Sequence, residues 1–176
     1  MPALCLDLDG TVRHPRSGKD FPQGLEDIEI FPEVEEKLLQ YRADGYLVLG
    51  ISNQGGVAFG FKTPQQNNAE HDAMIAQFEN GDPFHFTKYC FHHPNGSVVP
   101  YNYRSLLRKP DIGMLALMEY ELFDEGYIVD WDNSLFVGDR PEDQECAKRA
   151  GLSFHWAWDF FGRPNPNPTT QEVPTS

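Results

Sequence analysis

The sequence has 176 residues, 40% of them apolar and 23% charged, and this composition is typical of a globular protein of one domain with a buried core. Acidic side chains outnumber basic ones by 27 to 14, and the formal net charge of -13 opposes a broad, sequence-independent attraction to nucleic acid or anionic lipid. The sequence contains no apolar run of the roughly 18 to 20 residues that a membrane span needs, and its few, widely spaced cysteines argue against a disulfide framework, so we expect a cytoplasmic protein.

Short apolar runs alternate with helix-like segments up to about residue 160, which is the pattern of successive βαβ units. The predicted strands, in chain order, are residues 3–7, 46–52, 84–90, 135–137 and 152–156. Helices are predicted between the strands. The first begins at Pro32 and ends at Gly45, and the second begins at the capping box Thr63-Pro-Gln-Gln66 and ends at Asn80-Gly81. The third begins at Pro110 and ends at Gly126, and the fourth covers residues 141–150. The expected fold class is α/β, with a Rossmann-like parallel sheet flanked by helices.

The C-terminal segment differs in composition from the rest of the chain. Residues 163–176 begin with Arg163-Pro-Asn-Pro-Asn-Pro and contain almost no apolar side chains. Such a composition cannot bury enough apolar surface to offset the entropy lost when a chain is ordered. We therefore expect one domain over residues 1–162, followed by a disordered tail over residues 163–176.

Two carboxylates follow the first predicted strand. They belong to the segment Asp7-Leu-Asp9-Gly-Thr11, in which Asp7 and Asp9 are two residues apart. Open α/β folds bind their ligands at the carboxyl edge of the parallel sheet, where this segment is expected to lie. Taken alone, an Asp-x-Asp-Gly segment is more often a solvated turn than a catalytic site.

Three further segments are expected at the same edge. Ser52 and Asn53 end the second strand and precede two glycines, so a hydroxyl, an amide and backbone N–H groups become available to a phosphate. Lys109 precedes the third predicted helix, whose positive end favours anions. Asp139 and Asp143 follow the strand at residues 135–137 and add acidic groups. Together the segments supply what hydrolysis of a phosphomonoester through an aspartyl-phosphate requires: a nucleophile, an acid/base carboxyl, a cation and hydrogen-bond donors.

In their order and spacing, the four segments resemble the four motifs of the haloacid dehalogenase (HAD) superfamily over about residues 3–157. The resemblance implies that Asp7 is the nucleophile and a Mg²⁺ ligand. It also implies that Asp9 is the general acid and base and lends its backbone carbonyl to the metal. The remaining roles implied are phosphate binding by Ser52, Asn53 and Lys109, Mg²⁺ binding by Asp139, and support of the metal site by Asp143.

An Asp at position 9 marks the phosphatases and phosphotransferases of this superfamily, so the resemblance favours a phosphatase. Caps in the superfamily are insertions, and the segments after Thr11 and after Asn53 are too short for an additional domain. We therefore expect a HAD-like fold with no large cap domain. The alternative from another class is a phosphate-binding regulatory module that keeps the pocket and does not catalyse.

Two branches of the superfamily remain open. Residues 89–97 and the later Arg108-Lys-Pro110 resemble the heptose bisphosphate and histidinol phosphatases, which carry a zinc loop. Ser105 and Leu107 stand where that branch has two cysteines, so Cys90 and His92 alone remain and no structural zinc is expected. Residues 16–22 and 30–33 resemble the phosphatase portion of polynucleotide kinase/phosphatase, which removes 3′-phosphates from DNA. The sequence contains no phosphate-binding loop of a kinase.

Basic and aromatic side chains gather on the loops at the expected mouth of the site. The basic ones are Arg13, Arg16, Lys19, Arg104, Arg108, Lys109 and Arg140, of which Arg16, Lys19, Arg104 and Arg140 are candidate substrate contacts. The aromatic ones, which could stack on a base or pack locally, are Phe59, Phe61, Tyr101 and Tyr103. Because the net charge of -13 disfavours long polyanions, a small phosphorylated metabolite is preferred over a nucleic-acid end as the substrate.

Overall fold

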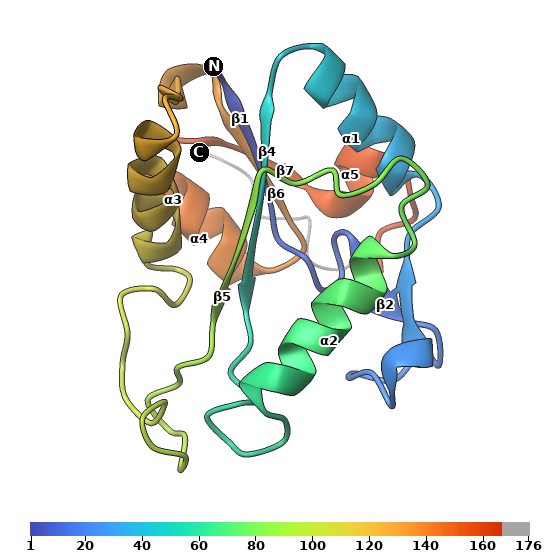
Figure 1. Cartoon of the computed structure of the whole chain (residues 1–176), viewed down its shortest axis with the longest axis vertical. Helices are drawn as coiled ribbons and strands as arrows, with labels where there is room; N and C mark the ends of the chain where they lie inside the picture. Colours follow the sequence, from blue (N-terminus) through green and yellow to red (C-terminus); the bar gives the residue numbers. More distant parts are fainter. Residues whose placement is uncertain (167–176) are drawn as a thin grey trace, which may run out of the picture.

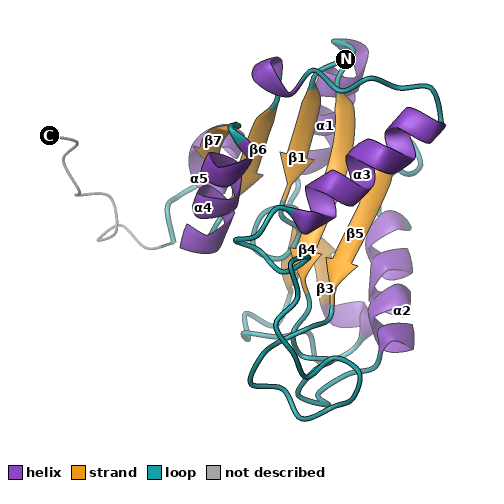
Figure 2. Cartoon of the chain, turned by 90° about the vertical axis from the view of Figure 1, so that its left-hand side faces the viewer, coloured by secondary structure: helices purple, strands orange, loops and turns teal. Residues whose placement is uncertain are grey.

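Five parallel strands form the central sheet of the structure, a computed structural model that describes residues 1–166. In chain order they are β1 (Ala3–Leu6), β4 (Leu47–Asn53), β5 (Phe86–Cys90), β6 (Leu135–Gly138) and β7 (Ser153–Trp156). Across the sheet the order is β5-β4-β1-β6-β7, so β1 lies in the centre between β4 and β6. All of them point toward the long loops at the lower end of Figure 2. The predicted α/β fold with a parallel sheet is confirmed.

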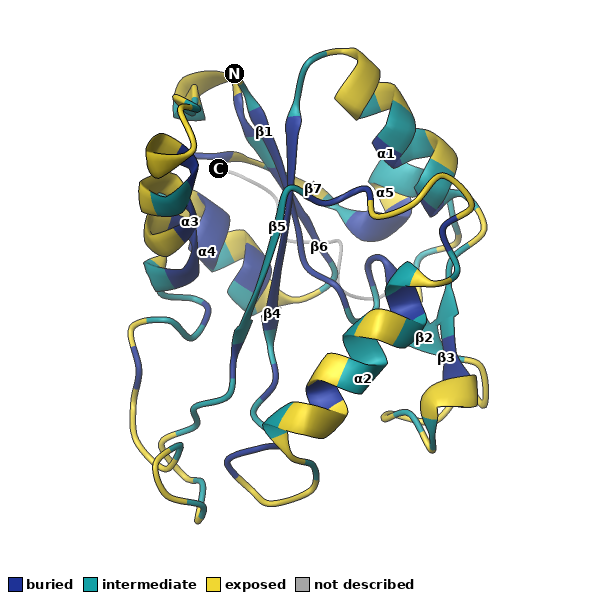
Figure 3. Cartoon of the chain, in the orientation of Figure 1, coloured by how far each residue is buried: buried dark blue, intermediate teal, exposed yellow. Residues whose placement is uncertain are grey.

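Helices cover both faces of this sheet (Figure 1). One face carries α3 (Gly113–Asp124) and α4 (Pro141–Ala150), and the other carries α1 (Val34–Ala43), α2 (Pro64–Ile75) and α5 (Ala157–Phe161). Side chains of β1 alternate between the faces, since Ala3 and Cys5 pack toward α3 and α4 whereas Leu4 and Leu6 pack toward the other helices. Strands β1 and β4 are buried along almost their whole length (Figure 3).

A small hairpin that the sequence did not predict lies between β1 and α1. Strand β2 (Arg13–Pro15) pairs antiparallel with β3 (Ile28–Ile30), and a turn of 3-10 helix, η1 (Leu25–Asp27), precedes β3. The Asp27 carboxylate holds the loop between the strands, because it accepts hydrogen bonds from the backbone N–H groups of Ser17 and Gln23 at 2.6 and 2.9 Å. The hairpin is far smaller than a domain, in agreement with the expected absence of a large cap.

Helices α4 and α2 begin where the sequence predicts, whereas α1 begins later. Helix α4 covers the predicted residues, and the predicted capping box opens α2. In that box the Thr63 hydroxyl accepts from the Gln66 N–H at 3.1 Å, and the Gln66 side chain accepts from the Thr63 N–H at 2.7 Å. Pro32 does not open α1, which begins at Val34 after a turn.

Within residues 1–166, no helix has both the length and the apolar character that crossing a bilayer requires.

Helix α3 also begins later than predicted. Pro110 was expected to open it, but the helix starts at Gly113. The Gly113 N–H donates to the Leu106 carbonyl at 3.0 Å, and this bond closes a loop in front of the helix. Lys109 therefore lies in the loop before α3, not in its first turn. A second turn of 3-10 helix, η2 (Trp131–Asn133), and the short α5 were not predicted either.

Arg163, the first residue of the predicted tail, is anchored to the domain. Its guanidinium lies 3.7 Å from the ring centroid of Phe31, and its Nε atom lies 3.0 Å from a carboxylate oxygen of Glu33. Its Nη2 atom donates to the Thr11 carbonyl. The structure therefore places this residue with the domain. Residues 167–176, which make up most of the predicted tail, lie outside the described residues.

Candidate active site

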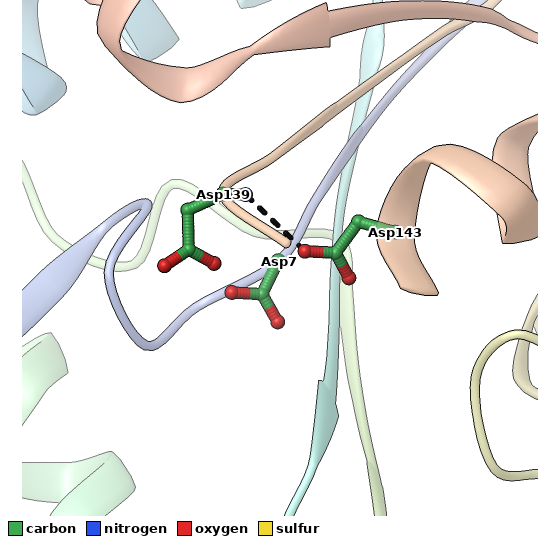
Figure 4. Close-up of side chains that lie close together, drawn as sticks. All are labelled: Asp7, Asp139 and Asp143. Atoms are coloured by element: carbon green, nitrogen blue, oxygen red, sulfur yellow. Dashed lines mark hydrogen bonds between the residues drawn. The ribbon is translucent and has the colours of Figure 1, made fainter. Parts of the chain in front are cut away.

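The carboxyl ends of β1 and β6 bring three aspartates together (Figure 4). Asp7 follows β1, Asp139 follows β6, and Asp143 lies in the first turn of α4. One carboxylate oxygen of each lies within 4.8 Å of the others. In the part of the chain that the structure describes, this is the one group of three or more histidine, cysteine or acidic side chains that could hold a metal ion.

Lys109 is the cation within this acidic group. Its buried Nζ atom lies 2.5 Å from Asp7 Oδ1 and 2.7 Å from Asp143 Oδ1, and it also donates to the Ile51 carbonyl at 3.1 Å. Burial disfavours the ammonium ion, but Asp7 and Asp143 hold the pKa of Lys109 above its usual value. Burial raises the pKa of Asp7 well above its usual range, against the effect of Lys109 and together with the neighbouring carboxylates. Lys109 thus pairs with two of the three carboxylates of the acidic group.

The loop after β6 and the start of α4 fix Asp139 and Asp143. Asp143 Oδ2 accepts hydrogen bonds from the backbone N–H groups of Asp139 and Arg140 at 3.2 and 3.1 Å. Gly10 has a φ of +87°, and a Cβ atom at that position would lie 2.1 Å from Asp139 Oδ2, so only glycine lets the loop after β1 approach this closely. Burial, followed by the charge of Asp143, raises the pKa of Asp139 to about 6.

Asp9 is held by donors from two directions. Arg13 Nε donates to Asp9 Oδ1 at 2.7 Å, and Gln54 Nε2 donates to Asp9 Oδ2. The Ser52 hydroxyl lies 3.3 Å from the same Oδ2 atom. Burial acts to raise the pKa of Asp9, but the charge and the hydrogen bond of Arg13 outweigh it and hold the pKa below its usual value.

Asn53 connects the end of β4 to the loop that carries Lys109. Its Nδ2 atom donates to the Lys109 carbonyl, and its Oδ1 atom accepts from the Lys109 N–H, both at 3.0 Å. The side chain that was expected to bind a phosphoryl group is therefore engaged with the backbone. Ser52, the other expected phosphate ligand of this segment, is buried beside Asp9.

A cavity of about 880 Å³ opens over these residues. Asp7, Asp9, Ser52, Asn53, Lys109, Asp139 and Asp143 all line it, so the structure brings the predicted motif residues to one site. The hairpin contributes Phe21 to the wall, and the loop after β4 contributes Phe59, Phe61 and Lys62. Arg108 and Arg140 are the guanidinium groups that line it.

Of the candidate substrate contacts, Arg140 alone lines the cavity within the described residues. Arg16 is 3.5 Å from Glu29, Lys19 donates to Gln23, and Arg104 donates to Asp111. These partners hold the three cations outside the lining of the cavity, and their contact with a substrate stays a prediction. Arg13 was also placed at the mouth, but its side chain is 2% exposed because it turns inward to Asp9.

The loop that resembles a zinc site has two candidate ligands near each other. Cys90 Sγ lies 3.9 Å from His92 Nδ1, and the His92 ring packs against Tyr103 with 4.6 Å between centroids. Ser105 is buried, and its hydroxyl accepts from the Leu107 N–H at 3.2 Å. That the loop binds no zinc stays a prediction.

Solved structures with the same fold include several phosphatases. A HAD-like phosphatase from Mesorhizobium loti matches with a TM-score of 0.73 and 29% identity, covering 86% of this chain and 69% of that one. The D,D-heptose 1,7-bisphosphate phosphatase of B. bronchiseptica, crystallised with magnesium and phosphate, matches with a TM-score of 0.68 and 25% identity over 88% of this chain and 79% of that one. Fold and site thus define a phosphatase of the HAD superfamily.

Within this superfamily, the polynucleotide kinase 3 phosphatase model matches residues 3–161, and the chain belongs to that family. The D-glycero-D-manno-heptose-1,7-bisphosphate 7-phosphatase of Chlorobaculum tepidum is 33% identical over 150 residues, which cover 85% of this chain and 74% of that protein. The corresponding enzyme of Escherichia coli K12 is 29% identical over 153 residues. These relatives support a phosphatase over a non-catalytic phosphate-binding module.

Proposed function

We propose that this phosphatase hydrolyses a small phosphorylated metabolite of the sugar-phosphate class, in a Mg²⁺-dependent reaction that passes through an aspartyl-phosphate on Asp7. The observation that carries the proposal is the pairing of the buried Asp7 carboxylate with Lys109 at 2.5 Å, with Asp9 lining the same cavity. A nucleophile, a cation for the phosphoryl charge and an acid/base group then share one site.

In the first half of the reaction, a carboxylate oxygen of Asp7 attacks the phosphorus atom and the bond from phosphorus to the leaving oxygen breaks. The negative charge of the bound phosphate opposes the effect of Arg13 on the pKa of Asp9, so that Asp9 takes up a proton. The Asp9 carboxyl then gives this proton to the leaving oxygen, and the leaving group departs as an alcohol. The Lys109 ammonium and the Ser52 hydroxyl neutralise and bind the phosphoryl oxygens. The product of this half is the aspartyl-phosphate.

In the second half, a water molecule attacks the phosphorus atom of the aspartyl-phosphate, and the bond to Asp7 breaks. Asp9, now a carboxylate, accepts a proton from that water. Inorganic phosphate leaves, and both aspartates return to their starting state. The two halves together consume one water and release one alcohol and one phosphate.

The acidic cluster fits a magnesium ion. Asp139 Oδ1 is a buried oxygen without a hydrogen-bond partner, and the three carboxylates outnumber the two cations beside them, Lys109 and Arg140. Oxygen ligands of this kind are the ones that Mg²⁺ prefers. We propose that Asp7 and Asp139 hold the ion through their side chains and Asp9 through its carbonyl, while Asp143 keeps Asp139 and Lys109 in place. When bound, the ion supplies positive charge that screens the nucleophile from the phosphate.

The size and lining of the cavity support a small substrate. A volume of about 880 Å³ lies within the usual range of small-molecule sites, roughly 300 to 1,000 Å³. Arg108 and Arg140 on its wall offer a second phosphate or a sugar hydroxyl an ionic or hydrogen-bonding partner. The heptose bisphosphate phosphatases among the relatives favour this substrate class.

The test is a phosphate-release assay of the purified protein on a sugar phosphate, a sugar bisphosphate and 4-nitrophenyl phosphate, each with Mg²⁺ or with EDTA. We expect release from the sugar phosphates with Mg²⁺, loss with EDTA, and recovery when excess Mg²⁺ is added back. Activity that survives EDTA would contradict the metal requirement. Failure on every sugar phosphate would contradict the substrate class.

A second candidate substrate is the 3′-phosphate of a nucleic-acid end. It is favoured by the family model and by Phe21 and Phe61, which line the cavity yet are 69% and 77% exposed and could stack on a base. At low salt we expect kcat/KM for a sugar phosphate to exceed that for a 3′-phosphorylated oligonucleotide. A tenfold preference for the oligonucleotide that falls on Phe61→Ala and with added salt would establish the second candidate instead.

A further inference from the structure

Asp9 is held by two side chains to which no role has been assigned above, Arg13 and Gln54. We infer that these two residues are positioning residues, which hold the Asp9 carboxyl where it can protonate the leaving oxygen. The inference rests on the proposed role of Asp9 as the general acid and base.

A tight turn brings Arg13 back over Asp9. The backbone N–H groups of Thr11, Val12 and Arg13 all donate to the Leu8 carbonyl, and the Gly10 N–H donates to the Arg13 carbonyl at 2.8 Å. Asp9 and Arg13 form an isolated bridge across this turn. The guanidinium therefore reaches the carboxylate of a residue only four positions earlier, at 2.7 Å.

Arg13 is itself fixed from the other side by α2. Its Nη1 atom donates to the Glu70 carbonyl at 3.2 Å, and its Nη2 atom lies 3.9 Å from the Glu70 carboxylate. Lys62 pairs with that carboxylate at 2.6 Å. Because the Arg13 side chain is only 2% exposed and bonded at several atoms, it has little freedom to follow a moving partner. The position of the Asp9 carboxylate therefore depends, through Arg13, on the position of α2.

Gln54 holds the second carboxylate oxygen from the end of β4. Its backbone N–H donates to the Cys90 carbonyl at 2.7 Å, which fixes the residue to the neighbouring strand β5. Its Nε2 atom donates to Asp9 Oδ2 and also lies 2.9 Å from the Ser52 hydroxyl. Gln54 therefore connects the acid/base residue to the proposed phosphate ligand.

The two contacts fix the plane of the Asp9 carboxyl, because each of its oxygens has its own donor. The Asp9 side chain is 42% exposed, in contrast to its two partners, and it lines the cavity. A carboxyl group in that setting would rotate freely if the donors were absent. Small errors in the placement of a proton donor reduce the rate steeply, so removal of either donor should impair proton transfer more than substrate binding.

The experiment compares kcat/KM for two substrates that differ in their need for a proton. An alkyl or sugar phosphate must leave as an alcohol, whereas 4-nitrophenyl phosphate leaves as a stable phenolate and needs little protonation. We expect Arg13→Lys and Gln54→Leu to lower kcat/KM by about tenfold or more for the alkyl substrate and by less than about threefold for the aryl substrate. KM for the alkyl substrate should change much less than kcat.

Asp9→Asn is the reference variant, and two further substitutions serve as controls. Gln77→Leu removes a partly buried amide that bridges α2 and β3 through the backbone of Ala73, Ile28 and Ile30, and none of its hydrogen bonds involves the side chain of Asp9, Arg13 or Gln54. Arg149→Met removes a guanidinium that is also bonded to two carboxylates, but on the outer surface. Both controls should leave the ratio of kcat/KM for the two substrates unchanged, even if they lower the melting temperature.

The outcomes separate this inference from the proposed function. One outcome is that Asp9→Asn shows the substrate-dependent loss while Arg13→Lys and Gln54→Leu lower kcat/KM equally for both substrates or leave it unchanged. In that case the inference is overturned and the proposed function stands. If Asp9→Asn itself retains activity on the alkyl substrate, the role of Asp9 is wrong and the inference falls with it. Should Arg13→Lys fail to fold, the Gln54→Leu result decides.

Discussion

The side chain of Asn53 forms two hydrogen bonds to the backbone of Lys109, one to its carbonyl and one from its N–H, each 3.0 Å long. This pair of bonds attaches the loop before α3 to the end of β4, although the two residues are 56 positions apart. The placement of the Lys109 ammonium beside Asp7 therefore depends on an amide side chain in a different motif.

Replacing Asn53 with Leu should displace Lys109 and lower both stability and activity. Two hydrogen bonds of about 1 kcal/mol each would be lost, and about 2 kcal/mol corresponds to a fall in the melting temperature of roughly 4 to 8 °C for a domain of this size. Thermal unfolding and kcat measure the two effects. A variant with native kcat would show that Lys109 holds its position without Asn53.

Asp7→Asn should abolish turnover while the protein stays folded. The substitution removes the nucleophile, and it also removes one charge from a crowded acidic group, so the fold should not suffer greatly. The measurements are the rate of phosphate release and the circular dichroism spectrum. Asp111→Asn is the matched control, because Asp111 is also paired with cations but does not line the cavity. Near-native rates for Asp7→Asn would refute the nucleophile assignment.

Asp139→Asn should have opposite effects with and without metal. In EDTA the variant should melt at a higher temperature than the native protein, because the repulsion among Asp7, Asp139 and Asp143 is reduced. With Mg²⁺ the native protein should gain stability by ligand binding and the variant should gain much less. Melting curves recorded under both conditions test this. An equal gain from Mg²⁺ in both proteins would exclude Asp139 as a ligand.

The purified protein should contain no stoichiometric zinc after dialysis. A structural zinc site needs four ligands, whereas Cys90 and His92 are accompanied by Ser105 and Leu107 in this loop. Elemental analysis decides the matter. One zinc per chain would mean that another residue, such as His93, completes the site.

His71 should contribute a loss of unfolding free energy as the pH falls from about 7.5 to 5.5, whereas the raised pKa of Asp139 acts in the opposite direction. Burial lowers the pKa of His71, and Arg13 adds to this effect while Asp82 and Asp72 oppose it. The unfolded chain takes up a proton at a pKa of about 6.5, before the folded protein does, so acid favours unfolding. His71→Gln should show a smaller loss of unfolding free energy in urea titrations at the two pH values. An unchanged loss would contradict the assignment.

The sequence predicted best what is determined by neighbouring residues. Helix α4 matches its predicted range because Pro141 opens it, Asp143 accepts from the backbone N–H of Arg140 just before the helix, and Gly151 ends it at a φ of +73°. Three of the four motifs supply the carboxylates and the lysine that meet in the cavity. These features follow from local chemistry and from the order of the strands.

What the sequence did not reveal depends on partners far along the chain. Arg13 was interpreted as a surface cation because nothing near it shows that Glu70, 57 positions later, would enclose it. The strands of the hairpin are three residues long, too short for an alternating pattern to be seen. The first turn expected at Pro110 was wrong because the Gly113 N–H bonds to the Leu106 carbonyl, seven positions earlier, and this bond closes a loop in front of α3.

The contacts of Arg163 bear on where the protein can be shortened without loss of interactions within the domain. A protein shortened after residue 162, the boundary that composition suggests, would lose the guanidinium that contacts Phe31, Glu33 and the Thr11 carbonyl. Thr11 lies two residues after Asp9, so the cut would remove a support of the loop that carries the proposed acid/base group. A truncation after residue 162 would thereby alter a loop that we propose to be catalytic.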